Sequence, residues 1–214
     1  VCFSVDHRLS PEIVFPGHLI DVKRALYWIK KNAYEYGVDP EFVVVTGGSA
    51  GGHLASLMAL TQNQPEFQPG FENAETSIKG CVSLYGVYEF NESFNAETFY
   101  PAKAKLLKIV CDGNPYNKPA IYRQISPANW ISSNNPPFLL VQGDTDALIS
   151  VNESRNFFQG LQSQNVQNCA ILNLPLVEHA FDIFPTLTAQ CIVPIIERYL
   201  VMLHENYINS KSEI

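Results

Sequence analysis

Residues 43–54 constrain the fold of this chain more than any other stretch, because an apolar β-branched run passes through Gly-x-Ser-x-Gly directly into a helix-forming segment. A serine on such a strand-to-helix turn has its hydroxyl held clear of the backbone, an arrangement called a nucleophile elbow. The turn strains the serine backbone, so we expect that the flanking Gly47 and Gly51 leave no room for a side chain. The stretch therefore predicts a reactive hydroxyl on Ser49.

The same turn supplies backbone donors beside the serine. The N–H groups of Ala50 and Gly51 lie at the predicted helix N-terminus and would point toward an oxyanion formed at Ser49. An incidental serine in a glycine-rich turn is the alternative, because Gly-x-Ser-x-Gly is short and recurs by chance. The strand before the motif and the helix after it favour the nucleophile, with the Ala50 N–H as an oxyanion-hole donor.

The rest of the chain alternates strand and helix signals around this turn. Apolar residues at three- and four-residue steps over 18–36 predict an amphipathic helix that stops at Gly37. Strands are expected at 1–5, 42–46, 78–85, 138–142 and 170–174, and further helices at 54–60, 102–110, 152–161 and 186–205. The alternation predicts one α/β domain over 1–205, with a mostly parallel sheet, helices on both faces and a frayed polar tail at 206–214.

An aromatic-rich insertion at about 88–125 interrupts this alternation. Its aromatic residues are Tyr88, Phe90, Phe94, Phe99, Tyr100, Tyr116 and Tyr122. A long insertion after a core strand often builds a lid or a substrate pocket, and a satellite core packed for stability is an equal alternative. As candidates to line a substrate pocket we take Tyr88, Phe90 and Phe181.

A serine hydroxyl is a weak nucleophile near pH 7 unless an imidazole takes its proton and a carboxylate fixes the tautomer of that imidazole. His179 follows the 170–174 strand on a loop, where such a base is expected. The remaining histidines precede Ser49 or lie on predicted helices, which is more typical of structural or solvated side chains: His7, His18, His53 and His204. His179 is therefore the predicted base.

Two aspartates follow the 138–142 strand, and either could be the acid. Asp146 lies further into the loop, where it can reach a histidine on the loop of the next strand. Asp144 adjoins Gly143 and is more typical of an aspartate whose side chain caps a turn. The resulting order of Ser49, Asp146 and His179 is that of the α/β-hydrolases, unlike the orders of other serine hydrolases.

Composition excludes several classes of partner. The chain has 14 Lys and Arg against 21 Asp and Glu, a formal charge of −7, and no basic cluster, so neither nucleic acid nor an anionic membrane is an expected partner. No apolar run approaches the length of a membrane span. The five cysteines lack metal-ligand spacing, which indicates free thiols and no metal site. Oligomeric state stays open, as does the compartment, for which the cytoplasm is favoured unless a targeting segment precedes Val1.

Four motifs give the chain a resemblance to a known family: residues 5–12 (VDHRLSPE) with Phe15 and Pro16, 47–52 (GGSAGG), 143–148 (GDTDAL) and 179–181 (HAF). Over nearly its whole length the chain resembles the hormone-sensitive-lipase-like branch of the α/β-hydrolases, a group of esterases and deacetylases. The resemblance implies a serine hydrolase that cleaves carboxylic esters of short or medium acyl groups through an acyl-enzyme, without a cofactor. An amide hydrolase of the arylformamidase or deacetylase type is one alternative. A non-catalytic or inactive binding protein of the same fold is another.

The sequence departs from the family pattern in three ways. The family usually has tyrosine at the position of His7 and an acidic residue at that of Gly48, which bears on substrate details. Its His-Gly-Gly-type loop, which completes the oxyanion hole, is absent, as is the strand that separates the 1–5 and 42–46 strands. We therefore expect an N-terminally truncated fragment whose second oxyanion donor lies upstream of Val1, with low stability and reduced activity by itself.

Overall fold

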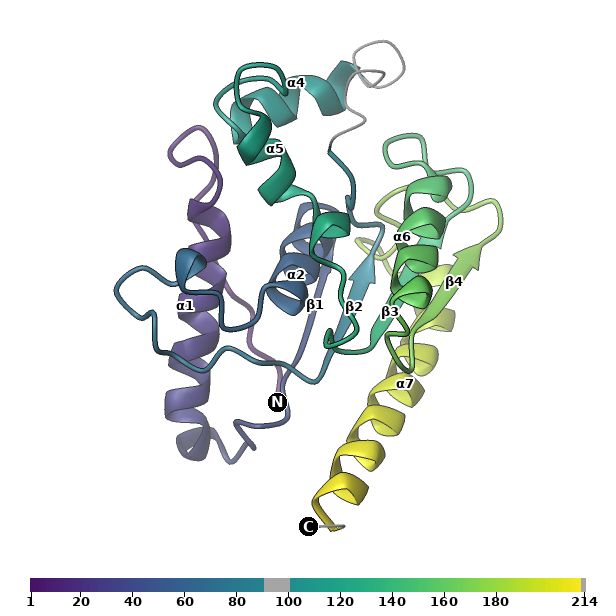
Figure 1. The fold of residues 1–214 in the computed structure, drawn as a ribbon. Helices are drawn as coiled ribbons and strands as arrows, with labels where there is room; N and C mark the ends of the chain where they lie inside the picture. Colours follow the sequence, from purple (N-terminus) through teal and green to yellow (C-terminus); the bar gives the residue numbers. More distant parts are fainter. Residues whose placement is uncertain (91–100, 213–214) are drawn as a thin grey trace.

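The protein is described by a computed structural model that covers residues 1–90 and 101–212 (Figure 1). Within this part of the chain lies a four-stranded sheet of order β1-β2-β3-β4, in which all neighbouring strands are parallel. The strands are β1 (Val44–Gly48), β2 (Gly80–Leu84), β3 (Phe138–Gly143) and β4 (Ala170–Leu174). The predicted α/β fold is thereby confirmed, and the carboxyl ends of the four strands meet at one edge of the sheet.

Helices alternate with the strands, as the sequence pattern predicts. The first helix, α1 (Gly17–Asn32), continues into the 3₁₀ turn η1 (Ala33–Tyr36), which ends at the left-handed Gly37 with φ 65°. The other helical elements of the described residues are α2 (Ala50–Leu60), η2 (Pro65–Phe67), α4 (Pro101–Val110), α5 (Pro119–Ile125), η3 (Pro127–Trp130), α6 (Val151–Ser163) and α7 (Leu187–Ser212).

Helices cover the sheet on both faces (Figure 1), and alternate strand residues point into two separate cores. Cys81 and Leu140 belong to the core beneath α1, α2 and α6, whereas Val82 and Leu139 belong to the core beneath α7. Every residue of β2 and β3 is buried. The two central strands therefore form a rigid base for the loops that leave their carboxyl ends.

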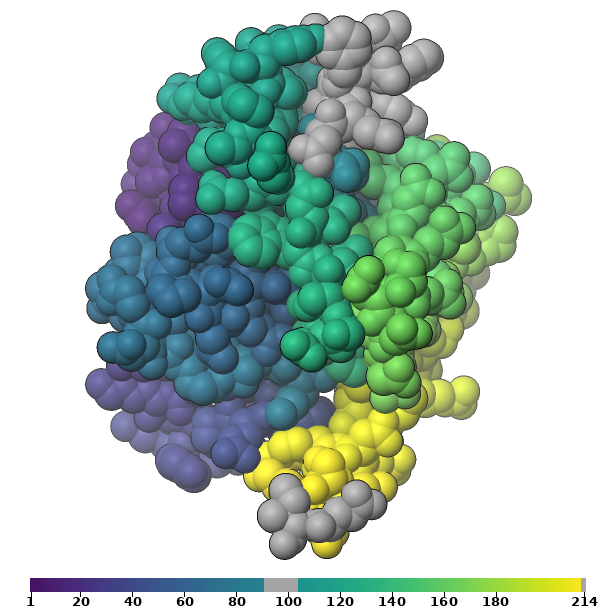
Figure 2. Space-filling view, in the orientation of Figure 1, coloured from purple at the N-terminus to yellow at the C-terminus, as the bar shows by residue number. Residues whose placement is uncertain are grey.

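The aromatic insertion contributes to the core beneath α2 and α6. The insertion residues buried in this core are Tyr88, Phe90, Leu107, Cys111, Tyr122 and Ile125. Figure 2 shows the teal segment that includes α4 and α5 running as a band between the blue α2 side and the green α6. Three of its aromatic residues, Phe94, Phe99 and Tyr100, lie outside the described residues. Packing thus accounts for the buried side chains, whereas Tyr116 is 72% exposed.

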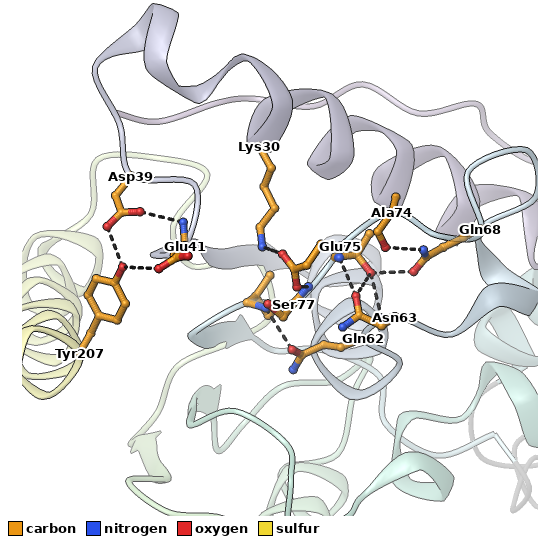
Figure 3. A network of polar contacts seen from close by, with 12 residues as sticks. Lys30, Asp39, Glu41, Gln62, Asn63, Gln68, Ala74, Glu75, Ser77 and Tyr207 are labelled. Atoms are coloured by element: carbon orange, nitrogen blue, oxygen red, sulfur yellow. Dashed lines mark hydrogen bonds and ion pairs between the residues drawn. The ribbon is translucent and has the colours of Figure 1, made fainter. Parts of the chain in front are cut away.

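The C-terminal segment differs from the expected frayed tail, because α7 stays helical as far as Ser212. Tyr207 is only 8% exposed, and its hydroxyl donates to the Asp39 carboxylate at 2.7 Å. Figure 3 shows Tyr207 pointing toward Asp39 and Glu41, and Lys211 forms an ion pair with Glu41 at 2.9 Å. These contacts to the turn before β1 hold the last turns of the helix in place.

Residues 1–5 were expected to form a strand and do not. A strand needs a neighbouring ladder to satisfy its backbone N–H and C=O groups. In the described part of the chain, β1 is an edge strand that pairs with β2 alone, so the prediction for 1–5 is wrong. Phe3 instead packs edge-on against Tyr36, with ring centroids 5.2 Å apart.

Candidate active site

Ser49 lies between the last residue of β1 and the first residue of α2, where the chain turns sharply. Its backbone adopts φ 55° and ψ −119°, a positive-φ conformation that is uncommon for residues other than glycine. The N–H of Ser49 donates to the carbonyl of Leu84 at 3.0 Å and so ties the turn to the end of β2. This is the geometry expected of a nucleophile elbow.

The glycines around Ser49 differ in how much room each leaves for a side chain. A Cβ on Gly47 would lie 2.4 Å from the carbonyl carbon of Gly51, so position 47 must be glycine. Gly51 itself faces open space, and the expectation that it leaves no room for a side chain is wrong. The crowded helix position is Gly52, where a Cβ would lie 2.9 Å from the carbonyl oxygen of Leu84. The reason is that residue 51 packs against Gly47 with its backbone, while residue 52 faces β2.

The structure brings the three predicted residues into one chain of hydrogen bonds. His179 Nε2 lies 2.9 Å from Ser49 Oγ, and His179 Nδ1 lies 2.7 Å from Asp146 Oδ2. Each residue follows the carboxyl end of a different strand: Ser49 follows β1, Asp146 follows β3 and His179 follows β4. The parallel sheet thus joins side chains that are 130 and 33 positions apart in the sequence.

The carboxylate of Asp146 is buried and fully surrounded by donors. Its side chain is 0% exposed. The backbone N–H groups of Leu148 and Ile149 donate to Oδ1, both at 2.8 Å, and Gln142 Nε2 donates to Oδ2 at 2.8 Å. With His179 Nδ1 these make four hydrogen bonds, which offset the cost of removing a carboxylate from water. Since an ionised carboxylate only accepts, Nδ1 of His179 carries a proton and Nε2 is free to accept one.

The loops that carry the acid and the base are joined to each other. Asp144 Oδ1 accepts from the N–H of Leu176 at 2.6 Å, and Leu176 has a positive φ of 56°. The Glu178 carboxylate accepts from the N–H of Ala147 at 3.2 Å. Asp144 therefore caps a turn, as predicted, although the turn belongs to the next loop. These bonds restrain the separation between Asp146 and His179.

Ala50, the predicted oxyanion donor, is the first residue of α2 and is exposed. N–H groups in the first turn of a helix have no acceptor within the helix. The Ala50 N–H thus lies beside Ser49 at the positive end of a helix, where it could stabilise an anion. Its role as an oxyanion donor stays a prediction.

Of the three pocket candidates, the structure brings only Phe181 close to the hydrogen-bonded residues. Tyr88 is 1% exposed and stacks on Phe157 at 4.3 Å, and Phe90 is 3% exposed with its ring 5.0 Å from that of His53. Both belong to the core, so neither side chain offers a surface to a substrate in this chain. Phe181 packs edge-on against Tyr85 at 5.1 Å.

Sequence reasoning missed two residues that support the site. Gln142 is 0% exposed and bonds to Asp146, and its Oε1 accepts from the Ser154 hydroxyl at 2.8 Å. A single amide in the otherwise apolar strand β3 was an available signal, because buried polar side chains are unusual. Tyr85 packs against the ring of His179 at 4.6 Å. Nothing in its local sequence distinguishes it from the other aromatic residues.

Neither metal ligation nor a disulfide is seen within the described part of the chain. No group of three or more His, Cys, Asp or Glu side chains there is arranged to hold a metal ion. The five cysteines are free, at positions Cys2, Cys81, Cys111, Cys169 and Cys191. Burial raises the pKa of the Cys111 thiol to about 11. No helix in residues 1–90 and 101–212 is both long and apolar enough to cross a membrane.

A serine on a strand-to-helix turn, followed in the chain by an aspartate and then a histidine after later parallel strands, defines the α/β-hydrolase class. The family model described as BD-FAE matches residues 1–161. The chain therefore belongs to the BD-FAE family, within the hormone-sensitive-lipase-like esterase branch of that class.

Curated relatives from Mycobacterium tuberculosis (strain ATCC 25618 / H37Rv) match over most of this chain. The "Probable carboxylic ester hydrolase LipM" is 40% identical over 205 residues, which is 95% of this chain and 47% of LipM. "Esterase LipQ" is 34% identical over 205 residues, which is 95% of this chain and 48% of LipQ. The chain thus spans about half the length of the curated relatives it matches.

Solved structures of esterases share the fold. A "truncated form of carbohydrate esterase from gut microbiota" has a TM-score of 0.76 at 20% identity, covering 92% of this chain and 73% of that one. "Thermogutta terrifontis esterase 2 phosphonylated by sarin" has a TM-score of 0.77 at 20% identity, covering 92% of this chain and 71% of that one. At this level of identity the likeness concerns the fold alone.

Proposed function

We propose that the protein containing this chain hydrolyses carboxylic esters, with Ser49 as nucleophile, His179 as base and Asp146 as the acid that orients His179. The observation that carries the proposal is the continuous hydrogen-bond chain from Ser49 Oγ through both ring nitrogens of His179 to the buried Asp146. Family membership and the ester hydrolase names of LipM and LipQ support it.

The first half of the reaction follows from the order of donors and acceptors. Ser49 Oγ attacks the ester carbonyl carbon while its proton passes to His179 Nε2, 2.9 Å away. The imidazolium that forms keeps its Nδ1–H on Asp146, whose negative charge stabilises it. When the tetrahedral intermediate collapses, His179 gives the proton to the leaving alkoxide, and an acyl group remains on Ser49.

The second half repeats the same steps with water. His179 Nε2 takes a proton from water as its oxygen attacks the acyl carbon, and the proton then returns to Ser49 Oγ as the carboxylic acid leaves. In both halves the negative charge forms on the former carbonyl oxygen. The Ala50 N–H would donate to it, and one such donor contributes about 3 kcal/mol to transition-state stabilisation.

The proposal is tested on the whole protein with a short-chain aryl ester and a fluorophosphonate probe. We expect hydrolysis and covalent labelling at Ser49, and loss of both in Ser49→Ala. Ser163→Ala is the matched control, because Ser163 is an exposed serine in the last turn of α6. A folded protein that neither hydrolyses the ester nor takes up the probe would refute the proposal.

Amide hydrolysis is a second candidate, favoured by one relative. "Arylacetamide deacetylase" from Oryctolagus cuniculus is 49% identical over 61 residues, although these are only 28% of this chain. Rates on an aryl ester and on the matching anilide with the same acyl group would separate the two activities. The anilide should be the slower substrate for an ester hydrolase by orders of magnitude, and comparable rates would favour the deacetylase.

A further inference from the structure

Tyr85 occupies an unusual position at the edge of the candidate site. It directly follows β2 and has a positive φ of 39°, in a region that residues other than glycine rarely adopt. Its N–H donates to the carbonyl of Val141 at 2.7 Å, which fixes this backbone to β3. The residue is only 3% exposed. Such a conformation persists where surrounding contacts over-determine it, often beside a functional site.

The side chain of Tyr85 contacts both elements that carry the reacting groups. On the nucleophile side, a Cβ placed on Gly48 would lie 2.5 Å from the Tyr85 hydroxyl oxygen, so the end of the ring fills the space beside the turn. On the base side, the ring packs edge-on against His179 at 4.6 Å. Its hydroxyl donates to the Asp182 carboxylate, on the same loop as His179.

We infer that Tyr85 is a positioning residue for His179. Through its bond to Asp182 it joins the loop of His179 to the turn of Ser49, and this holds the imidazole ring in the plane needed for proton transfer. The hydrogen bonds at Nδ1 and Nε2 define a single axis through the imidazole ring. The ring can still rotate about this axis, which would turn the in-plane lone pair of Nε2 away from Ser49 Oγ. The edge contact from Tyr85 supplies the third restraint, and small losses of alignment are costly in rate.

The hydroxyl of Tyr85 remains a donor over the working pH range. Burial raises the pKa of Tyr85 well above its ordinary value, and the neighbouring Asp182 carboxylate raises it further. Tyr85 therefore keeps the proton that it donates to Asp182. The inference rests on the proposed function, because it assigns Tyr85 a part in the action of His179.

The first test uses variants at each end of the bond between Tyr85 and Asp182. Each variant is made in the whole protein, and its steady-state hydrolysis of an aryl ester is measured. We expect Tyr85→Phe and Asp182→Ala each to lower kcat about ten-fold with KM unchanged, and the double variant to be no slower than either. Asp182→Asn should recover most of the loss, because its amide oxygen still accepts from the tyrosine. Tyr34→Phe is the matched control, since Tyr34 is 83% exposed.

A second variant approaches the same contact from the nucleophile side. In Gly48→Ala the new methyl group meets only the far end of the Tyr85 ring, so the fold should survive while the ring moves. We expect a fall in kcat at least as large as that of Tyr85→Phe. The unfolding free energy of each variant is measured in parallel, to separate loss of alignment from loss of the folded state.

A spectroscopic readout makes the inference independent of turnover. The proton between His179 Nδ1 and Asp146 should give a low-field NMR resonance, and we expect it to shift or broaden in Tyr85→Phe and Asp182→Ala but not in Tyr34→Phe. An unchanged resonance together with wild-type kcat would overturn the role of Tyr85. A wild-type protein that shows neither hydrolysis nor fluorophosphonate labelling would instead count against the proposed function, and the resonance would still test Tyr85.

Discussion

Replacing Asp146 by asparagine should reverse the tautomer of His179. Oδ1 of Asp146 accepts from the backbone N–H groups of Leu148 and Ile149. The amide oxygen of an asparagine must occupy this place, because its NH₂ group would otherwise face two donors. The NH₂ then takes the place of Oδ2 and points at His179 Nδ1 and Gln142 Nε2. His179 can satisfy it only with an unprotonated Nδ1, which puts the proton on Nε2.

The size of the effect follows from this reversal. With a proton already on Nε2, His179 cannot accept the proton of Ser49 Oγ, so general-base catalysis is lost. A tautomer reversal of this kind in a serine protease lowers kcat by about 10⁴-fold, equivalent to about 5.5 kcal/mol at about 1.4 kcal/mol per factor of ten. Gln142 cannot readily relieve the clash by turning its amide, because Oε1 accepts from Ser154 and Nε2 also donates to the carbonyl of Ile149 at 3.2 Å.

The assay is steady-state hydrolysis of an aryl ester by the whole protein, together with the rate of fluorophosphonate labelling. In Asp146→Asn both rates should fall by about 10⁴-fold, with KM little changed. Asp144→Asn is a matched control two residues away, since its amide oxygen can still accept from Leu176; its kcat should stay within about three-fold of wild type. An Asp146→Asn variant that keeps more than about a tenth of the activity, or an equal loss in Asp144→Asn, would refute the reasoning.

Three further experiments test contacts that support the fold and the site. Burial lowers the pKa of Lys23 from 10.5 to about 8, so the native state binds fewer protons than the unfolded chain between these values. The unfolding free energy of the wild type, relative to that of Lys23→Met, should therefore rise by up to ~3 kcal/mol from pH 8 to 10.5. It is measured as the difference between the urea unfolding curves of the two proteins, because the titrations of cysteine and tyrosine then cancel. Gly47→Ala should lower the unfolding free energy by more than about 2 kcal/mol, because its Cβ meets backbone atoms, whereas Gly51→Ala should change it very little. Equal urea midpoints for the two variants would contradict the packing around Ser49. Gln142→Met removes a donor from Asp146 and should lower kcat about ten-fold, and an unaltered kcat would show that the other donors suffice.

The elements of the fold were largely predictable, because periodicity and turn residues act locally. The strand at 170–174 agrees with β4, and the helix stop at Gly37 agrees with its left-handed conformation. Local signals could not predict how far α7 extends. Its last turns depend on the bond between Tyr207 and Asp39, which are 168 positions apart.

The aromatic insertion illustrates a limit of a different kind. Aromatic side chains suit a core and a binding pocket equally well, so composition left both alternatives open. For Tyr88 the ring of Phe157 on α6 decides between them, because the stacking of these rings leaves Tyr88 buried. The partner is supplied by a helix that follows more than sixty positions later in the chain.

The sequence by itself determined which residues are candidates for chemistry. Ser49 is marked by its turn, His179 by its loop and Asp146 by its place after a strand, because each signal is local and the chemistry admits few residue types. Only the tertiary structure decided what holds them in place. Tyr85 follows β2 and its ring meets that of His179, which follows β4, so this contact depends on strand order and register, which no local pattern encodes. Gln142 lies only four positions from Asp146, but its bond depends on how the loop after β3 folds back on that strand.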